Sequence, residues 1–278
     1  MPLLFLLLLV LVGCALSLPG SREGVRFFLR PDFSVFSVHT LFEALGQTFF
    51  SLSVGMGCLV TYASYFGPSV PLGHSALQTA ALDTLVAILA GLIIFPATFS
   101  VGVMPDAGPS LIFITLPSVF QQAFSAFPWL GILVGSVFYI LLVLAALTSL
   151  ISLHEGPTAF VHEEFHISRR AAARWVTVLA MVSGTLCSLS LGKGTWLHIG
   201  KRSLFDFLDY LTADYLLILG GLLTVIYVGW VLPEDTLRAE MTNHGAHRFR
   251  IYPLFRFAVR YVCPVSIVLI FLHQLGVI

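Results

Sequence analysis

The chain has 278 residues, of which 58% are hydrophobic and only 10% are charged. Since a water-soluble domain carries roughly a quarter charged residues, this composition excludes a soluble fold of this length. The formal net charge is zero, from 14 basic and 14 acidic residues, so nothing indicates nucleic-acid binding. The four cysteines lie inside apolar runs without paired spacing, which argues against a disulfide framework or a cysteine metal site.

Apolar runs near the ~20 residues that cross a bilayer recur along the chain. Seven membrane segments are predicted, at residues 1–18, 41–66, 76–103, 128–161, 171–192, 206–232 and 252–275. Between them, residues 104–127 are predicted to form an ordered loop with a short helix. The sequence therefore predicts an all-α, multi-pass bundle of the cell membrane that forms one transmembrane domain over residues 1–278.

The first segment, residues 1–18, shares features with a signal peptide, and residues 11–14 resemble a lipoprotein cleavage site. A signal peptide begins with positive charge, yet the first basic residue is Arg22, so we expect a retained membrane helix. If this helix runs outward from the cytoplasm, eight arginines lie inside and six basic residues lie outside, Arg26 and Arg30 among them. This difference favours the orientation only slightly.

The second segment carries hydroxyl side chains and two glycines, Gly55 and Gly57, near its middle. Glycine disfavours a continuous helix and lets the backbone approach a ligand closely. Unwound backbone at this depth is tolerated only where it is buried or lines a cavity. A continuous helix that packs through small residues fits the same pattern, so both interpretations stay open.

Polar groups in the later segments are candidates for binding. Asp83 and Glu155 lie within apolar stretches, where a carboxylate is costly unless a cation or a hydrogen-bond donor meets it. Asp83 could instead reach water near a helix end, and the Gly-Pro after Glu155 makes a structural role at a kink nearly as plausible. Thr148 and Ser149 put two hydroxyls together, either as Na⁺ ligands or as groups bonded back to their own helix.

Residues 162–166 fit the metalloprotease pattern H-E-x-x-H. On a helix, this spacing places His162 and His166 on one face for Zn²⁺, with Glu163 as the general base. No convincing third ligand follows in the sequence. A membrane zinc protease is therefore kept as an alternative function.

Taken together, the segments resemble the neurotransmitter:sodium symporter family. The sixth helix of that family is matched by residues 47–65, QTFFSLSVGMGCLVTYASY, and the seventh by residues 83–95, DTLVAILAGLIIF. Residues 108–120 resemble the fourth extracellular loop, 145–149 the eighth helix and 253–264 the start of the eleventh. The resemblance covers the chain in order and implies an incomplete LeuT-type bundle of helices five to eleven, with a discontinuous second segment.

The resemblance also implies roles for individual residues. The substrate-binding positions are Phe50, Ser51, Ser53, Met56 and Ser149. The Na⁺ ligands are Ser51 and Asp83 at one site and the Ala145 carbonyl, Thr148 and Ser149 at the other. Asp209 matches the extracellular-gate carboxylate, and Glu163 matches the cytoplasmic-gate acid, which gives the H-E-x-x-H glutamate a non-catalytic explanation.

Two departures from the family pattern matter. Asp83 stands where the family often has Asn, and Ala87 stands where relatives bind chloride through Ser or replace it with Glu. The chain also begins at the family's fifth helix, so we expect that alone it does not transport and needs an N-terminal half or another copy. The expected function is symport of an amino acid or related amine with Na⁺, and a membrane protein that interacts without transporting is a further alternative.

Overall fold

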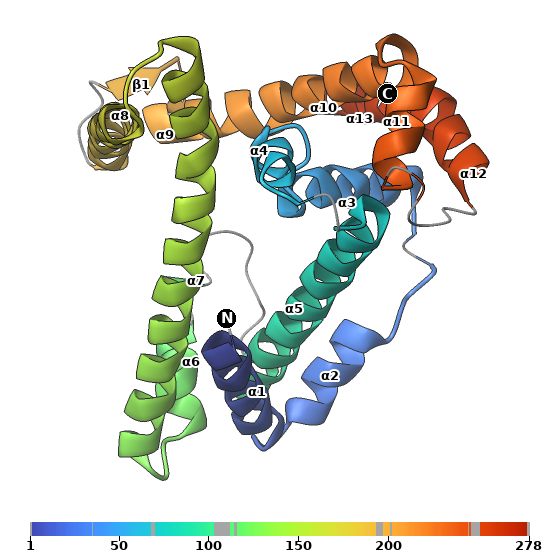
Figure 1. Cartoon of the computed structure of the whole chain (residues 1–278). Coiled ribbons are helices and arrows are strands. Elements are labelled where there is room, and N and C mark those ends of the chain that lie inside the picture. Colours follow the sequence, from blue (N-terminus) through green and yellow to red (C-terminus); the bar gives the residue numbers. More distant parts are fainter. Residues whose placement is uncertain are drawn as a thin grey trace. The chain divides into compact units, whose positions relative to one another are not determined.

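The computed structural model describes residues 2–34, 36–67, 70–102, 112–113, 116–192, 197–200, 202–243, 245 and 251–276. Within this part the chain is almost entirely helical, as the all-α prediction requires (Figure 1). It divides into two compact units. Unit 1 comprises residues 1–36 and 81–150, and unit 2 comprises residues 37–80 and 151–278.

Unit 1 contains α1 (Pro2–Leu16), α2 (Ser21–Leu29), α6 (Leu116–Ala123), and parts of α5 (Leu72–Ser100) and α7 (Pro128–Glu164). Its core joins apolar residues from α1, α5, α6 and α7, with Leu11, Ile93 and Leu116 almost fully buried. The short α6 lies in the loop for which a helix was predicted, whereas residues 103–111 and 114–115 lie outside the described residues.

The sequence did not predict α2. This short helix follows α1 at a bend of 117°. Its Ser21 and Gly24 are buried, and Phe28 stacks on Phe95 of α5 with ring centroids 5.0 Å apart. The hydropathy pattern overlooked α2 because two arginines and a glutamate interrupt its nine residues, SREGVRFFL.

Unit 2 begins with α3 (Val38–Ser51) and α4 (Cys58–Ser64) and continues through the end of α7 to α8 (Arg169–Ser190). A two-stranded antiparallel sheet of β1 (His198–Ile199) and β2 (Arg202–Ser203) follows. The remaining helices are α9 (Leu204–Asp209), α10 (Leu217–Ile226), α11 (Glu234–Met241), α12 (Tyr252–Phe257) and α13 (Cys263–Gln274). Three π-helical segments, Tyr210–Leu216, Tyr227–Val231 and Ala258–Val262, interrupt the later helices.

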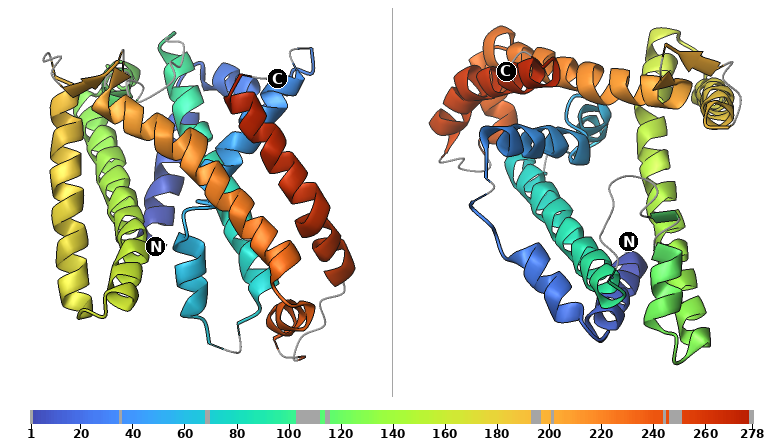
Figure 2. Two further views of the ribbon diagram at one scale, coloured as in Figure 1. Left: turned by 90° about the horizontal axis from the view of Figure 1, so that it is seen from above. Right: turned by 180° about the vertical axis from the view of Figure 1, so that it is seen from behind.

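The packing of unit 2 is seen best from above and behind. In Figure 2, α8 runs back beside the end of α7, and α13 lies along α10. Ile218 of α10 meets Ile267 and Ile270 of α13 in a buried cluster, and α3 covers it through Phe42 and Phe49.

Five described helical stretches are long and apolar enough to cross a membrane: Leu72–Ser100, Pro128–Glu164, Arg169–Ser190, Leu204–Val231 and Tyr252–Gln274. The bent pair α1 and α2 counts as a sixth if it is one broken span. Neither α3 nor α4 is long enough alone, because the segment predicted at 41–66 is broken between them. The chain is thus a multi-pass membrane protein, and the division into seven membrane segments stays a prediction.

Candidate functional site

The centre of the candidate site is the break between α3 and α4, at residues 52–57. The backbone there turns through positive φ angles at Ser53 (53°), Gly55 (89°) and Gly57 (80°). Glycine adopts such angles freely, whereas Ser53 is strained, as residues at functional sites often are. The discontinuous helix predicted from the sequence is therefore confirmed, and the two glycines are the reason that the chain can break here.

The break is seated on a pair of glycines of α10. A Cβ built on Gly55 would lie 2.2 Å from the carbonyl oxygen of Leu217, and one on Gly220 would lie 2.4 Å from the carbonyl oxygen of Gly55. A Cβ on Gly221 would lie 2.8 Å from the ring of Phe49. Backbone therefore meets backbone without intervening side chains. This contact was not predicted from the sequence, although the two adjacent glycines in an apolar run were a visible sign of it.

A cavity of about 320 Å³ opens beside the break. Its walls come from the break, the end of α7 and the start of α10, and are largely apolar. The lining residues are Phe50, Gly55, Met56, Cys58, Leu153, Pro157, Thr212, Ala213, Leu216 and Leu217. The side chains of Phe50 and Met56 are half-exposed, and of the residues predicted to bind substrate these two line the cavity. Ser51 ends α3 and Ser53 lies in the break, but neither is among the lining residues.

A second cavity, of about 680 Å³, shares the lining residues Phe50 and Ala213 with the first. It is more polar than the first. Its titratable lining residues are His39, Glu43, Asp209, Asp214 and His273. The structure thus places Asp209, the predicted extracellular-gate residue, on the wall of a cavity next to Phe50.

A π-helical segment shapes this wall. Asp209 and Asp214 are five residues apart and line the same cavity, because the π-helical turn at Tyr210–Leu216 brings residues i and i+5 onto one side. The hydroxyls of Tyr210 and Tyr215 lie 2.5 Å apart on this turn, and the Arg202 guanidinium lies 3.7 Å from the centre of the Tyr210 ring. No residue pattern indicates the π-helical turn, which depends on backbone hydrogen bonding.

The predicted Na⁺ ligands other than Ser51 belong to unit 1. Asp83 lies in α5, and Ala145, Thr148 and Ser149 lie in α7. The hydroxyl of Thr148 donates a 2.8 Å hydrogen bond to the carbonyl oxygen of Ala145. The structure therefore brings two predicted ligands of one Na⁺ site together, and it also shows the bond back to the helix that the sequence left open as the alternative.

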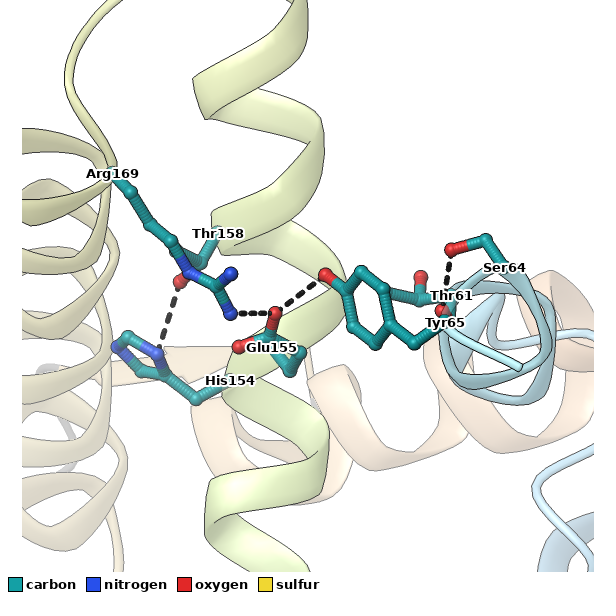
Figure 3. Close-up of polar contacts among 7 residues, drawn as sticks. All are labelled: Thr61, Ser64, Tyr65, His154, Glu155, Thr158 and Arg169. Atoms are coloured by element: carbon teal, nitrogen blue, oxygen red, sulfur yellow. Dashed lines mark hydrogen bonds and ion pairs between the residues drawn. The ribbon is translucent and has the colours of Figure 1, made fainter. Parts of the chain in front are cut away.

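A polar cluster joins three elements at the end of α7 (Figure 3). Glu155 accepts a 2.7 Å hydrogen bond from the hydroxyl of Tyr65, at the end of α4. Arg169, the first residue of α8, pairs with the same carboxylate oxygen, and its guanidinium lies 6.0 Å from the Tyr65 ring centre. Sequence reasoning proposed Glu155 as a candidate but named neither partner, since Tyr65 and Arg169 lie on distant parts of the chain.

His154, next to Glu155 in α7, also bonds to a residue of α8. Its Nε2 lies 2.9 Å from the Thr177 hydroxyl, and its Nδ1 lies 3.0 Å from the Thr158 hydroxyl. Thr177 already donates to the Ala173 carbonyl, so Nε2–H of His154 must donate to Thr177. This bond joins α7 to α8, and the hydroxyl of Thr158, on the same helix as His154, meets the other ring nitrogen.

The H-E-x-x-H motif does not form a zinc site. Its two histidines would face one way only on a continuous helix, yet α7 ends at Glu164 and His166 has a φ of 51°. Nδ1 of His162 donates instead to the carbonyl of Ile167, at 2.6 Å. Among the residues that the structure describes, no three His, Cys, Asp or Glu side chains could hold a metal ion. The membrane metalloprotease alternative is therefore not supported, and Glu163 lies beside the end of α7.

Comparison with known proteins agrees with this architecture. The family model for the sodium:neurotransmitter symporter family matches residues 1–278. A sodium-dependent transporter of Haemophilus influenzae is 35% identical over 277 residues, which are 99% of this chain and 59% of the relative. The sodium-dependent transporter YhdH of Bacillus subtilis is 34% identical over 279 residues, 100% of this chain and 60% of the relative.

The crystal structure of MhsT in complex with L-phenylalanine superposes with a TM-score of 0.85 at 36% identity. That match covers 99% of this chain and 61% of MhsT. The chain thus spans about three fifths of the length of these relatives. The family match over all 278 residues and the shared LeuT-type fold lead to one conclusion: this chain belongs to the sodium:neurotransmitter symporter family.

Proposed function

We propose that this chain forms part of a symporter that moves an apolar amino acid or related amine together with Na⁺, without covalent chemistry. The observation that carries the proposal is the break at residues 52–57, beside a cavity of about 320 Å³. Unwound backbone leaves N–H and C=O groups available to the charged ends of an amino acid. A continuous helix would bond these groups internally.

The lining of the cavity supports an apolar or aromatic substrate side chain. Phe50, Met56 and Leu153 present an aromatic ring, a thioether and an aliphatic side chain. Methionine adapts its shape to different apolar partners, so Met56 suits a pocket for bulky side chains. The MhsT structure, which binds L-phenylalanine, supports the same substrate class.

Sodium coupling is proposed through two sets of oxygen ligands. Ser51 and Asp83 form the first, and the Ala145 carbonyl with Thr148 and Ser149 forms the second. Hydroxyl, carbonyl and carboxylate oxygens are the ligands that hard cations prefer. Asp209 and Glu163 act as gate acids on the two sides of the substrate, and the Tyr65–Glu155–Arg169 cluster ties down the end of α4 near Glu163.

A chimera tests the proposal. Residues 1–278 replace the matching 60% of the Bacillus subtilis relative, and uptake of radiolabelled amino acids is measured in liposomes with an inward Na⁺ gradient. We expect saturable, Na⁺-driven uptake with a preference for phenylalanine and leucine over aspartate and lysine, and no uptake by residues 1–278 alone. Sodium-independent uptake, or a preference for charged amino acids, would contradict the proposal.

A further inference from the structure

The exposed face of α2 carries a row of arginines that the transport proposal does not use. Arg22, Arg26 and Arg30 follow one another at intervals of four and therefore lie along one side of the helix and its end. All three are exposed, and none of their side chains has a hydrogen bond or ion pair with a described residue. Phe27 and Leu29, each 54% exposed, lie beside them, and one side of the Phe27 ring packs against Phe95 and Phe99 of α5, with ring centroids 5.5 and 5.2 Å apart.

The opposite face of α2 is fixed on α5. A Cβ on Gly24 would lie 2.5 Å from the carbonyl oxygen of Phe95, and one on Gly91 would lie 2.3 Å from the ring of Phe28. Gly20 in turn lies against Ser100. As the residue number rises along α2, its contact on α5 moves back from Ser100 to Gly91. The helix is thus held antiparallel along the last nine or so residues of α5, and its basic face cannot turn inward.

This part of α5 is covered by protein, unlike the rest of the helix. Its buried residues are Gly91, Ile93, Pro96, Ala97 and Thr98. With 29 residues α5 is about 44 Å long, whereas the hydrocarbon core of a bilayer is about 30 Å thick. The excess of about nine residues leaves room for one end of α5 to project from the hydrocarbon core. Because the exposed arginines of α2 are costly in hydrocarbon, we place α2, with the stretch of α5 that it covers, at the level of the lipid headgroups.

We propose that the outer face of α2 binds the headgroups of anionic phospholipids. Each guanidinium fork matches two oxygens of a phosphate, and Leu29 with the exposed side of the Phe27 ring meets the boundary of the acyl chains. Glu23 lies on the same exposed side, which leaves a net charge of +2 on the face. The chain bends by 117° after the apolar α1, so the basic face of α2 begins next to the end of an apolar helix.

A photo-crosslinking analogue of phenylalanine at position 27 reports on the lipid that meets this face. The purified chain is placed in bilayers of equal parts phosphatidylglycerol and phosphatidylcholine with identical acyl chains, and lipid adducts are counted by mass spectrometry. We expect adducts mainly with phosphatidylglycerol. The same analogue at Phe160, an exposed residue of α7, serves as the control and should show no headgroup preference.

The arginines are then removed. Near an anionic surface each is worth about fivefold in binding, so R22Q/R26Q/R30Q should lower the phosphatidylglycerol preference at position 27 by roughly a hundredfold. E23Q, on the same side, should preserve or raise it. Because these side chains are exposed and make no hydrogen bond or ion pair in the described part of the chain, the thermal unfolding of the triple variant should match that of the parent. If the triple variant is less stable, R26Q alone serves as the test and should lower the lipid preference by a smaller factor.

Three results would overturn the proposal. Equal adducts with both lipids at position 27 would show a solvated basic face, as would a preference that survives the triple substitution. If inorganic phosphate at millimolar concentration abolished the preference for phosphatidylglycerol, the arginines would form a site for a free anion and not for lipid headgroups.

Discussion

The hydroxyl of Tyr65 donates a 2.7 Å hydrogen bond to Oε1 of Glu155, ninety residues further along the chain. Arg169 pairs with the same oxygen, so one carboxylate joins the end of α4 to α7 and α8 (Figure 3). A buried thiol, Cys58, stands at the other end of α4 and packs close to Gly156. The rate at which a reagent labels this thiol therefore reports on how firmly α4 is held in place.

The first prediction is that this cluster controls the mobility of α4. In a background where Cys14, Cys187 and Cys263 are alanine, Tyr65→Phe should raise the rate at which maleimide labels Cys58 by about threefold. Glu155→Gln should raise it further, because it weakens the contacts to both partners at once. Tyr62→Phe, on the same helix, is the control and should leave labelling unchanged; equal effects at positions 62 and 65 would contradict the prediction.

The second prediction concerns the seat of the helix break. Gly55→Ala meets both a positive φ and the carbonyl of Leu217, and should lower the free energy of unfolding by about 3–4 kcal/mol. Gly57→Ala has a similar φ but no atom within 4 Å of its Cβ, so about 1–2 kcal/mol is expected. Denaturation in detergent measures both. If the two variants were equally stable, the close approach of the break to α10 would not matter energetically.

The third prediction tests the Na⁺ role of Thr148. In the chimera, Thr148→Val keeps the shape of the side chain but removes an oxygen, and should raise the Na⁺ concentration for half-maximal uptake by about tenfold. Thr185→Val removes a hydroxyl that is likewise bonded to its own helix, at Met181, and serves as the control. An unchanged Na⁺ dependence in the Thr148 variant would contradict the Na⁺ role and assign the hydroxyl a structural one.

The fourth prediction is that Asp83 replaces chloride. The carboxylate supplies a negative charge beside a bound Na⁺, and the neighbouring Ala87 has no side-chain group for an anion. Uptake by the chimera should therefore be the same in chloride and in gluconate, and Asp83→Asn should weaken Na⁺ binding. Asp32→Asn, in an exposed loop, should change neither. Strict dependence of the parent on chloride would be incompatible with this role.

The residues of the second segment show how far sequence reasoning reached. Gly55 and Gly57 made a broken helix possible, and the family resemblance made it expected, but a packed helix stayed open. In the structure the helix is broken, because Gly220 and Gly221 of α10 let the unwound backbone approach to contact distance. The sequence pattern alone could not pair these glycines across more than 160 residues.

The polar cluster and the π-helical turn could not be predicted from the sequence for a similar reason. Glu155 was visible as a carboxylate in an apolar stretch, but its partners Tyr65 and Arg169 come from other elements. Asp214 joins Asp209 on one wall because a π-helical turn shifts the register, and no residue pattern marks such a turn. The H-E-x-x-H motif is the opposite case: the pattern predicts two histidines on one helix face, but α7 ends before His166.

By itself the sequence determined that the chain is an all-α membrane protein. Apolar composition and the length of apolar runs are local properties, and they alone decide whether a segment can cross a bilayer as a helix. Its motifs also determined the family. Only the tertiary structure decided what the polar and small residues do. Hydrogen bonds, ion pairs and backbone contacts act over a few ångströms, so Glu155, Gly55 and the basic face of α2 acquire their partners or their exposure only when distant segments fold together.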